Sequence, residues 1–384
     1  MNKIYLDNAA TTPIDKEVIE VMYESMLHNN GNPSSSHQFG RKAKSSIETA
    51  RKNIAKHFKV TASEIIFTAG GTEADNLILH NAVLNLGVET IITSKIEHHA
   101  VLHTAKYLQK NHNATIVYVT IDKNGDVDLN HLEQLLETHK TQKCLVSLMY
   151  VNNEIGNLLP LDSVSEICKK YNVLFHSDTV QAIGHYPIDL KKTPIDFIAA
   201  SAHKFHGPKG VGFAYFKKGF GIQPMLHGGD QEKGARSSTE NVHSILGMEK
   251  ALEIAISNIE KDTIYLSELK KYFISELKSN FKEVAFNGNS EYIEKSSYTI
   301  LSLRFANAND MLLFRLDLNG IAVSGGSACQ SGSSKGSHVL DEILSEKDAK
   351  DISVRFSFSK NTTKEEIDTT VLKLKELLRS KHQY

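Results

Sequence analysis

Short apolar runs alternate with longer amphipathic stretches along most of this chain, and this alternation constrains the fold more than any other feature. Runs rich in β-branched residues predict strands at residues 64–68, 90–93, 115–119, 144–149, 173–176, 196–200 and 212–216. Apolar residues at helical spacing predict helices before or between them, at residues 40–58, 129–138 and 161–171. Strands that alternate with helices form βαβ units around a parallel sheet. We therefore predict an α/β fold with a mostly parallel sheet.

A different pattern begins beyond the glycine-rich residues 218–230. A long helix is predicted at residues 244–261, followed by shorter strands at 299–303 and 352–356 and a last helix at 363–378. Strands and helices mixed in this way predict a smaller α+β domain. The long helix marks the expected boundary between the two domains.

The charge balance excludes one large class of function. The 384 residues contain 44 Lys and Arg against 45 Asp and Glu, so the chain lacks the basic surface that nucleic-acid binding requires. No apolar run approaches the roughly 20 residues of a membrane span, and the first residues lack the apolar core of a signal peptide. The three cysteines lie far apart and make no disulfide framework. We expect a cytoplasmic protein with no nucleic-acid or membrane partner.

Ligands of parallel sheets bind at the carboxyl ends of the strands, so the residues that follow the strands are the candidate site. Gly70 and Gly71 join the first strand to a helix, whose first N–H groups could bind an anion together with the Thr72 hydroxyl. A glycine turn in which Thr72 only caps the helix is the alternative. His98 follows the second strand and could lie against a planar ligand or act as an acid or base.

The histidines beyond His98 invite a metal hypothesis, which we reject. His99 and His103 would lie one helical turn apart, with Glu97 nearby. Their order is not that of a known zinc motif and no third ligand is evident. No metal is therefore expected.

Later strand ends carry an amide, an acid and an amine. Asn153 follows a core strand, and Asp178 ends an apolar strand, where a buried carboxylate needs a partner. That partner could be a ligand cation, or Asp178 could be a simple capping residue. Lys204 ends another hydrophobic strand, with Ser201 and His203 before it and glycines after it. This setting suits a lysine whose pKa is lowered. A neutral amine of this kind can form an imine with an aldehyde.

One cysteine differs from the other two. Cys329 lies at the centre of residues 324–337, where Gly and Ser dominate and predict a mobile loop. Cys144 falls on a predicted core strand and Cys168 on a helix face, so both are expected to be inert apolar residues. Cys329 is the candidate nucleophile.

Motifs spread over nearly the whole chain carry a resemblance to a known family. They are Tyr5-Leu6-Asp7-Asn8-Ala9-Ala10-Thr11-Thr12, Gly31-Asn32-Pro33-Ser34-Ser35, Gly71-Thr72-Glu73, Glu97-His98, Asn152-Asn153-Glu154-Ile155-Gly156, Asp178-Thr179-Val180-Gln181, Ser201-Ala202-His203-Lys204, Arg236-Ser237-Ser238-Thr239, Ser327-Ala328-Cys329 and Arg355-Phe356-Ser357. Together they resemble the cysteine desulfurases of the class-V aminotransferase family, which use pyridoxal 5′-phosphate (PLP) and supply sulfur for iron–sulfur clusters.

The resemblance implies the PLP-dependent transferase fold of type I. The large PLP-binding domain would comprise residues 14–257. Residues 1–13 and 258–384 would form the small domain, which carries the loop of the catalytic cysteine at about residues 324–338. This is the α/β fold with a mostly parallel sheet and a smaller α+β domain that the alternating pattern predicts.

The resemblance also implies how PLP is bound. Lys204 would bind it covalently, Asp178 would pair with the pyridinium nitrogen, and His98 would stack on the ring face. Gln181, with Asn153 nearby, would face the phenolic oxygen of the ring. The phosphate would be held by Gly71, Thr72, Ser201, Ala202, His203 and, from the second subunit of a homodimer, Thr239.

The substrate implied is L-cysteine. Arg355, with Asn32 close by, would bind its carboxylate, and Lys204 would take the α-proton. The thiolate of Cys329 would then attack the substrate sulfur, which yields L-alanine and a persulfide on Cys329. The extended loop resembles that of the branch passing sulfur directly to an iron–sulfur scaffold protein, so such a protein is the expected acceptor. Cys329 could transiently ligate a nascent cluster.

Two positions depart from the family pattern, and other functions stay open. Ser238 stands where relatives commonly have Gly, and Gln330 follows the cysteine where Ser or Thr is common. A selenocysteine lyase and an aminotransferase of small amino acids would share the same PLP class. Cys329 distinguishes these, because transamination gives it no role. A non-catalytic assembly or sensor protein that keeps the fold is the alternative outside enzymes.

Overall fold

The carboxyl ends of parallel strands converge at one edge of a seven-stranded sheet. The structure is a computed structural model that describes residues 3–306, 308–309, 311–325 and 336–379. The sheet has the order β2-β8-β7-β6-β5-β3-β4. Its strands are β2 (Ile65–Thr68), β3 (Thr90–Thr93), β4 (Thr115–Tyr118), β5 (Cys144–Ser147), β6 (Leu174–Asp178), β7 (Phe197–Ser201) and β8 (Gly212–Phe216). Only β8 runs antiparallel to its neighbours β2 and β7 among these strands, so the predicted α/β class is confirmed.

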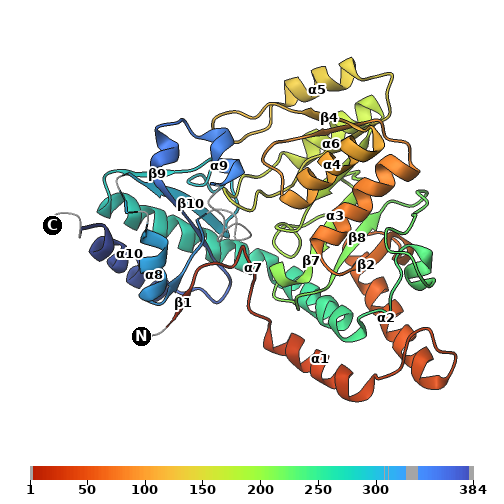
Figure 1. Ribbon diagram of the computed structural model, residues 1–384. Coiled ribbons are helices and arrows are strands. Elements are labelled where there is room, and N and C mark those ends of the chain that lie inside the picture. The colour runs from red at the N-terminus through yellow and green to blue at the C-terminus, as the bar shows by residue number, and fades with distance from the viewer. Residues whose placement is uncertain (1–2, 307, 310, 326–335, 380–384) are drawn as a thin grey trace.

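Helices cover both faces of this sheet (Figure 1). On one face, α3 (Gly71–His80) and α4 (His99–His112) pack on Ile66, Leu145 and Phe197. The opposite face is covered by α2 (Gln38–His57), α5 (Leu129–Thr138), α6 (Leu161–Tyr171) and the first part of α7 (Val242–Asn280). Cys144 and Cys168 are buried, are not in a disulfide and lie in the core on this opposite face of the large sheet; both were predicted to be inert apolar residues. A sheet buried on both faces explains why its strands are continuous apolar runs.

A second core lies in the C-terminal part of the chain, around the antiparallel sheet β12-β10-β9. Its strands are β9 (Val284–Phe286), β10 (Ile300–Phe305) and β12 (Ile352–Ser357), with helices α8 (Leu312–Leu318), α9 (His338–Ile343) and α10 (Lys364–Arg379) nearby. The N-terminal β1 (Ile4–Tyr5) pairs in parallel with β11 (Ile321–Ala322), and Ile4 and Leu6 pack into this core. The chain then leaves through α1 (Lys16–His28) toward the large sheet. The domain limits expected from the resemblance stay a prediction.

The long helix α7 extends much further than its sequence pattern suggested. The prediction ended it at residue 261, whereas it comprises 39 residues and ends at Asn280. Leu266, Phe273 and Leu277 continue the apolar face beyond the predicted end and pack in the second core. No glycine or proline interrupts residues 258–280, so α7 joins both cores. In the described part of the chain, no helix has the length and apolarity to cross a bilayer.

Lys270 on α7 is fully buried, and its partners among the described residues are a hydroxyl and a carbonyl oxygen instead of a carboxylate. Its Nζ donates hydrogen bonds to Ser296 Oγ at 2.8 Å and to the carbonyl oxygen of Ser297 at 2.7 Å. Burial lowers the pKa of Lys270 to about 7, because desolvation disfavours the charged amine. Since the same amine has a pKa near 10 in the unfolded chain, folding releases a proton between these two pH values.

The stability of the protein is therefore expected to rise with pH through this window. Because the folded state binds fewer protons there, the free energy of unfolding should increase on the order of 4 kcal/mol from about pH 7 to about pH 10. Lys270→Met should remove most of this increase, measured by urea unfolding at several pH values. Lys271→Met changes the exposed neighbour on the same helix and is the matched control. Equal pH slopes in the wild type and in Lys270→Met would contradict a neutral Lys270.

Candidate active site

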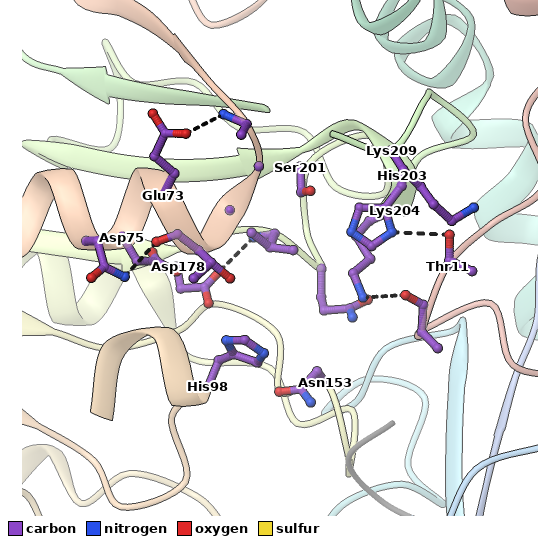
Figure 2. A pocket seen from close by; sticks show the side chains of 18 of the residues that line it. Thr11, Glu73, Asp75, His98, Asn153, Asp178, Ser201, His203, Lys204 and Lys209 are labelled. Atoms are coloured by element: carbon purple, nitrogen blue, oxygen red, sulfur yellow. Dashed lines mark hydrogen bonds between the residues drawn. The ribbon is translucent and has the colours of Figure 1, made fainter. Parts of the chain in front are cut away.

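A cavity of about 890 Å³ lies at the carboxyl ends of the parallel strands, where the sequence predicted a site. Figure 2 shows side chains from several strand ends pointing toward this common space. The predicted site residues that line it are Gly71, Thr72, His98, Asn153, Asp178, Gln181, Ser201, His203, Lys204 and Arg355. Segments far apart in the sequence thus meet at one place, as expected for strand ends of a parallel sheet.

The remaining predicted site residues lie elsewhere. Ala202 is fully buried in the core beneath the cavity. Asn32 and Thr239 are exposed and do not line the cavity of the single chain. Cys329 and Gln330 lie outside the described residues. The roles expected of these residues stay predictions.

Lys204 lies in a short 3₁₀ turn, Ala202–Lys204, directly after β7. Its half-buried amine donates hydrogen bonds to the carbonyl oxygens of Ala9 at 2.6 Å and Ala10 at 2.9 Å. The amide of Gln181 donates to the same Ala9 carbonyl at 2.9 Å. The N-terminal segment therefore forms one wall of the cavity and fixes the position of the lysine amine (Figure 2).

Asp178, at the end of β6, is a buried carboxyl that faces the same cavity. Its Oδ1 accepts a hydrogen bond from the backbone N–H of Val180 at 2.9 Å. Burial raises the pKa of Asp178, and the hydrogen bond from Val180 and the charge of Lys204 act against that rise. A cationic ligand nitrogen placed against this carboxyl would favour its ionised form and satisfy its remaining acceptor capacity.

The start of α3 provides a binding place for an anion. Gly70 has φ +150°, and a Cβ on Gly71 would lie 2.5 Å from a methyl group of Val180, so neither position accommodates a side chain. The backbone N–H groups at the start of α3 are thus left open toward the cavity, with Thr72 and Ser201 also lining it. Such a helix start attracts phosphate.

His98 caps the N-terminus of α4 and is neutral at physiological pH. Its Nδ1 accepts a hydrogen bond from the backbone N–H of Ala100 at 3.1 Å. Burial, followed by the charge of Lys204, lowers the pKa of His98 to about 4. Because Nδ1 is an acceptor, the proton of the neutral ring is on Nε2.

Arg355 on β12 brings a buried guanidinium from the small sheet into the cavity wall. Nη2 donates to Asp7 Oδ1 at 2.9 Å and Nη1 to the carbonyl oxygen of Asn153 at 2.6 Å. The buried Nε has no hydrogen-bond partner among the described residues. A guanidinium at the cavity wall with an N–H donor still unused suits a carboxylate ligand.

An ion pair joins two of the motifs that lie far apart in the sequence. Arg236 Nε donates to Glu73 Oε1 at 2.8 Å, and Glu73 Oε2 accepts from the backbone N–H of Ala69 at 2.8 Å. The pair thereby holds the residues ahead of Thr239 against the start of α3. Ser238, in this segment, has φ +97°, a backbone conformation that favours glycine.

Several cavity residues were not foreseen from the sequence. Thr11 bonds to His203 at 3.2 Å, and Lys209 lines the cavity beside it. Asp75, within α3, is also buried at the cavity wall. An acid near the N-terminus of a helix looks like an ordinary partner of the helix dipole, so only the contacts of the folded chain single out Asp75.

The histidines after His98 cluster with a histidine from the C-terminal part of the chain. The ring of His99 lies 4.7 Å from that of His103 and 4.4 Å from that of His338. Within the described ranges there is no group of three or more His, Cys, Asp or Glu side chains that could hold a metal ion.

Comparisons with known proteins agree with this geometry. The model of the aminotransferase class-V family matches residues 4–370. The cysteine desulfurase IscS of Dictyoglomus turgidum is 42% identical over 381 residues, which cover 98% of this chain and 94% of that protein. A solved NifS-like protein superposes with a TM-score of 0.90 at 38% identity, covering 99% of this chain and 100% of that one. The solved structure of SspA in complex with cysteine superposes with a TM-score of 0.79 at 29% identity, covering 93% of this chain and 99% of that one.

The chain belongs to the class-V aminotransferase family and, within it, to the PLP-dependent cysteine desulfurases. The cavity residues fit PLP. A buried carboxyl at Asp178 suits a ring nitrogen, the side-chain-free helix start at Gly70 and Gly71 suits a phosphate, and the amine of Lys204 lies in the same cavity.

Ser238→Gly is expected to stabilise the protein. A serine at φ +97° is strained, and glycine relieves that strain while costing some chain entropy, for a net gain of about 1 kcal/mol. Thermal unfolding of the PLP-loaded protein measures the change. Ser237→Gly is the control, because Ser237 is buried, donates to the carbonyl oxygen of Gly229 at 2.8 Å and should lose stability. A lower unfolding temperature for Ser238→Gly would refute the strain at this position.

Proposed function

We propose that this protein removes the sulfur of L-cysteine, yielding L-alanine and a persulfide on Cys329, and delivers that sulfur to an acceptor for iron–sulfur cluster assembly. The reaction balances, since the thiol of Cys329 gains the sulfur atom and the substrate carbon gains the hydrogen. The family membership supports the reaction. The observation that supports this reaction most directly is that Lys204, Asp178 and Arg355 line the same cavity.

Bound PLP would supply an electron sink that stabilises negative charge on the substrate Cα. Asp178 would bind its ring nitrogen, Gln181 and Asn153 would face its phenolic oxygen, and His98 would lie on its ring. Its phosphate would be held by Gly71, Thr72, Ser201, Ala202 and His203. These roles are supported by the cavity in which all but Ala202 take part.

The side chains would divide the proton chemistry between them. Lys204 Nζ would receive the α-proton. Its hydrogen bonds to the carbonyl oxygens of Ala9 and Ala10 hold the amine at the wall of the cavity, where it can face a bound substrate. His98 would present the Nε2 proton as a donor, since its Nδ1 is engaged by Ala100. Arg355 would bind the substrate carboxylate and, with Asn32, orient the Cα–H bond.

The assembly that we propose is a homodimer in the cytoplasm. Thr239 is exposed in the single chain, outside its own cavity, and would complete the phosphate site of a second copy. The glycine- and serine-rich residues around Cys329 favour an acceptor that docks directly, such as an iron–sulfur scaffold protein. Free buried thiols at Cys144 and Cys168 suit a reducing compartment.

The absorbance spectrum of the purified protein, followed by L-cysteine and a thiol reductant, tests the proposed function. A yellow protein that forms alanine and sulfide in equal amounts is expected. A yellow protein that forms neither would move the substrate to selenocysteine or another amino acid. A protein that takes up no added PLP would refute the role of Lys204.

Cys329→Ser separates sulfur transfer from cofactor binding. The variant should lose sulfide release by at least about a hundredfold, because serine offers no thiolate, while its PLP absorbance stays that of the wild type. Cys168→Ser is the control, since Cys168 is buried in the core away from the cavity. Full sulfide release by Cys329→Ser would exclude a persulfide on this residue as a required step.

A further inference from the structure

A second aspartate lies behind the proposed cofactor base. Asp75 on α3 is 1% exposed and lines the cavity, and its Oδ1 lies 3.4 Å from Nε2 of His176. His176 is fully buried, and its Nδ1 is 2.9 Å from the hydroxyl of Ser147 on β5. Both Asp75 Oδ1 and His176 Nε2 are buried without a hydrogen-bond partner among the described residues, so two acceptor atoms face each other at a distance that one proton could bridge. Ser147, His176 and Asp75 thus form a continuous row of polar groups.

The strand period explains why this row ends next to Asp178. His176 and Asp178 are two residues apart on β6, so their side chains lie on the same face of the sheet. That face is covered by α3, which carries Asp75. Burial raises the pKa of Asp75 well above its ordinary value, and the negative charges of Asp178 and then Glu97 raise it further.

The distribution of charge decides where the proton of this row lies. Burial lowers the pKa of His176 to about 3, so its ring is neutral. The titratable groups around Asp75 are His176 and Asp178 on β6 and Glu97 ahead of α4, while Lys204 after β7 acts on Asp178. Three neighbouring carboxyls cannot all be ionised in one buried space. The neutral pair, with the proton on Asp75 directed at His176 Nε2, avoids that repulsion.

We propose that Asp75 is a positioning residue for Asp178: it stays protonated, donates to His176, and leaves Asp178 as the ionised member of the aspartate pair beside the ring nitrogen of bound PLP. This inference rests on the proposed function for the identity of the ligand. Asp75 itself touches neither the substrate nor the reacting atoms. It acts by keeping the second negative charge away from Asp178 and by filling the space beside it.

Asp75→Asn and Asp75→Ala distinguish a neutral Asp75 from an ionised one. Asparagine keeps the shape, the absence of charge and an N–H donor toward His176, so the full-length variant should bind PLP within about twofold of the wild type. Alanine leaves His176 Nε2 without its donor and opens a cavity, so PLP affinity should fall on the order of tenfold. Titration of the PLP-free proteins with PLP, followed by absorbance, measures both. The pH dependence of the bound PLP band should match the wild type only in Asp75→Asn.

The stability of the PLP-free protein gives a second readout that does not involve activity. The unfolded chain loses the proton of Asp75 near pH 4 while the folded chain keeps it, so this group costs stability increasingly as the pH rises above about 4. The urea midpoint of Asp75→Asn should therefore rise relative to the wild type over that range.

Asp196→Asn provides the matched control in the same sheet. Asp196 Oδ1 pairs with Lys217 Nζ at 2.9 Å and Oδ2 accepts from the backbone N–H of Phe175 at 2.9 Å. Weakening these two contacts should lower the urea midpoint relative to the wild type. The same behaviour in Asp75→Asn, or a PLP affinity of Asp75→Asn as low as that of Asp75→Ala, would overturn the proposal. Failure of the wild type to bind PLP would instead overturn the proposed function.

Discussion

A buried carboxyl at the end of β6 sets the requirement that the rest of the site meets. Asp178 is removed from water at the point where the parallel strands end, so its negative charge needs a positive partner. Lys204 acts on it from β7, and the family membership supplies a cofactor whose ring nitrogen can carry a proton. The placement of the other groups follows, with an open helix start for an anion on one side and Arg355 from the small sheet on the other.

The N-terminal segment connects the two cores at this site. Leu6 packs in the small core, while the carbonyl oxygens of Ala9 and Ala10 accept hydrogen bonds from Lys204. Asp7 pairs with Arg355, which also donates a hydrogen bond to the backbone carbonyl oxygen of Asn153, a residue that follows β5 of the large sheet. The lysine and the arginine are therefore positioned by the same short stretch of chain, and a change there affects cofactor and substrate groups together.

The sequence predicted the limits of the seven strands of the large sheet to within two residues, because continuous apolar runs bounded by glycine or polar residues leave little choice of limits. β3 and β8 coincide with their predicted ranges. The strand-end positions of Asp178 and Lys204 followed from the same pattern, whereas their roles came from the resemblance to a family. The full length of α7 was missed because its apolar side chains pack in one core in the first part of the helix and in the other core in the last part. Asp75 was missed because His176, which it faces, lies about a hundred residues away in the chain. Thr239 could not be located at the cavity, because it is exposed in the single chain.

The continuity of α7 limits how the two parts of the molecule can move. A helix of 39 residues is roughly 60 Å long, and its two ends are buried in different cores. Bending it would break backbone hydrogen bonds in the middle, where no proline or glycine provides a weak point. Closure over a substrate by a hinge within α7 is thus energetically expensive. Any opening and closing of the cavity is therefore expected to be a small sliding or rotation of one core relative to the other about a rigid α7. The segments that cross between the cores beside α7 would then undergo the backbone changes.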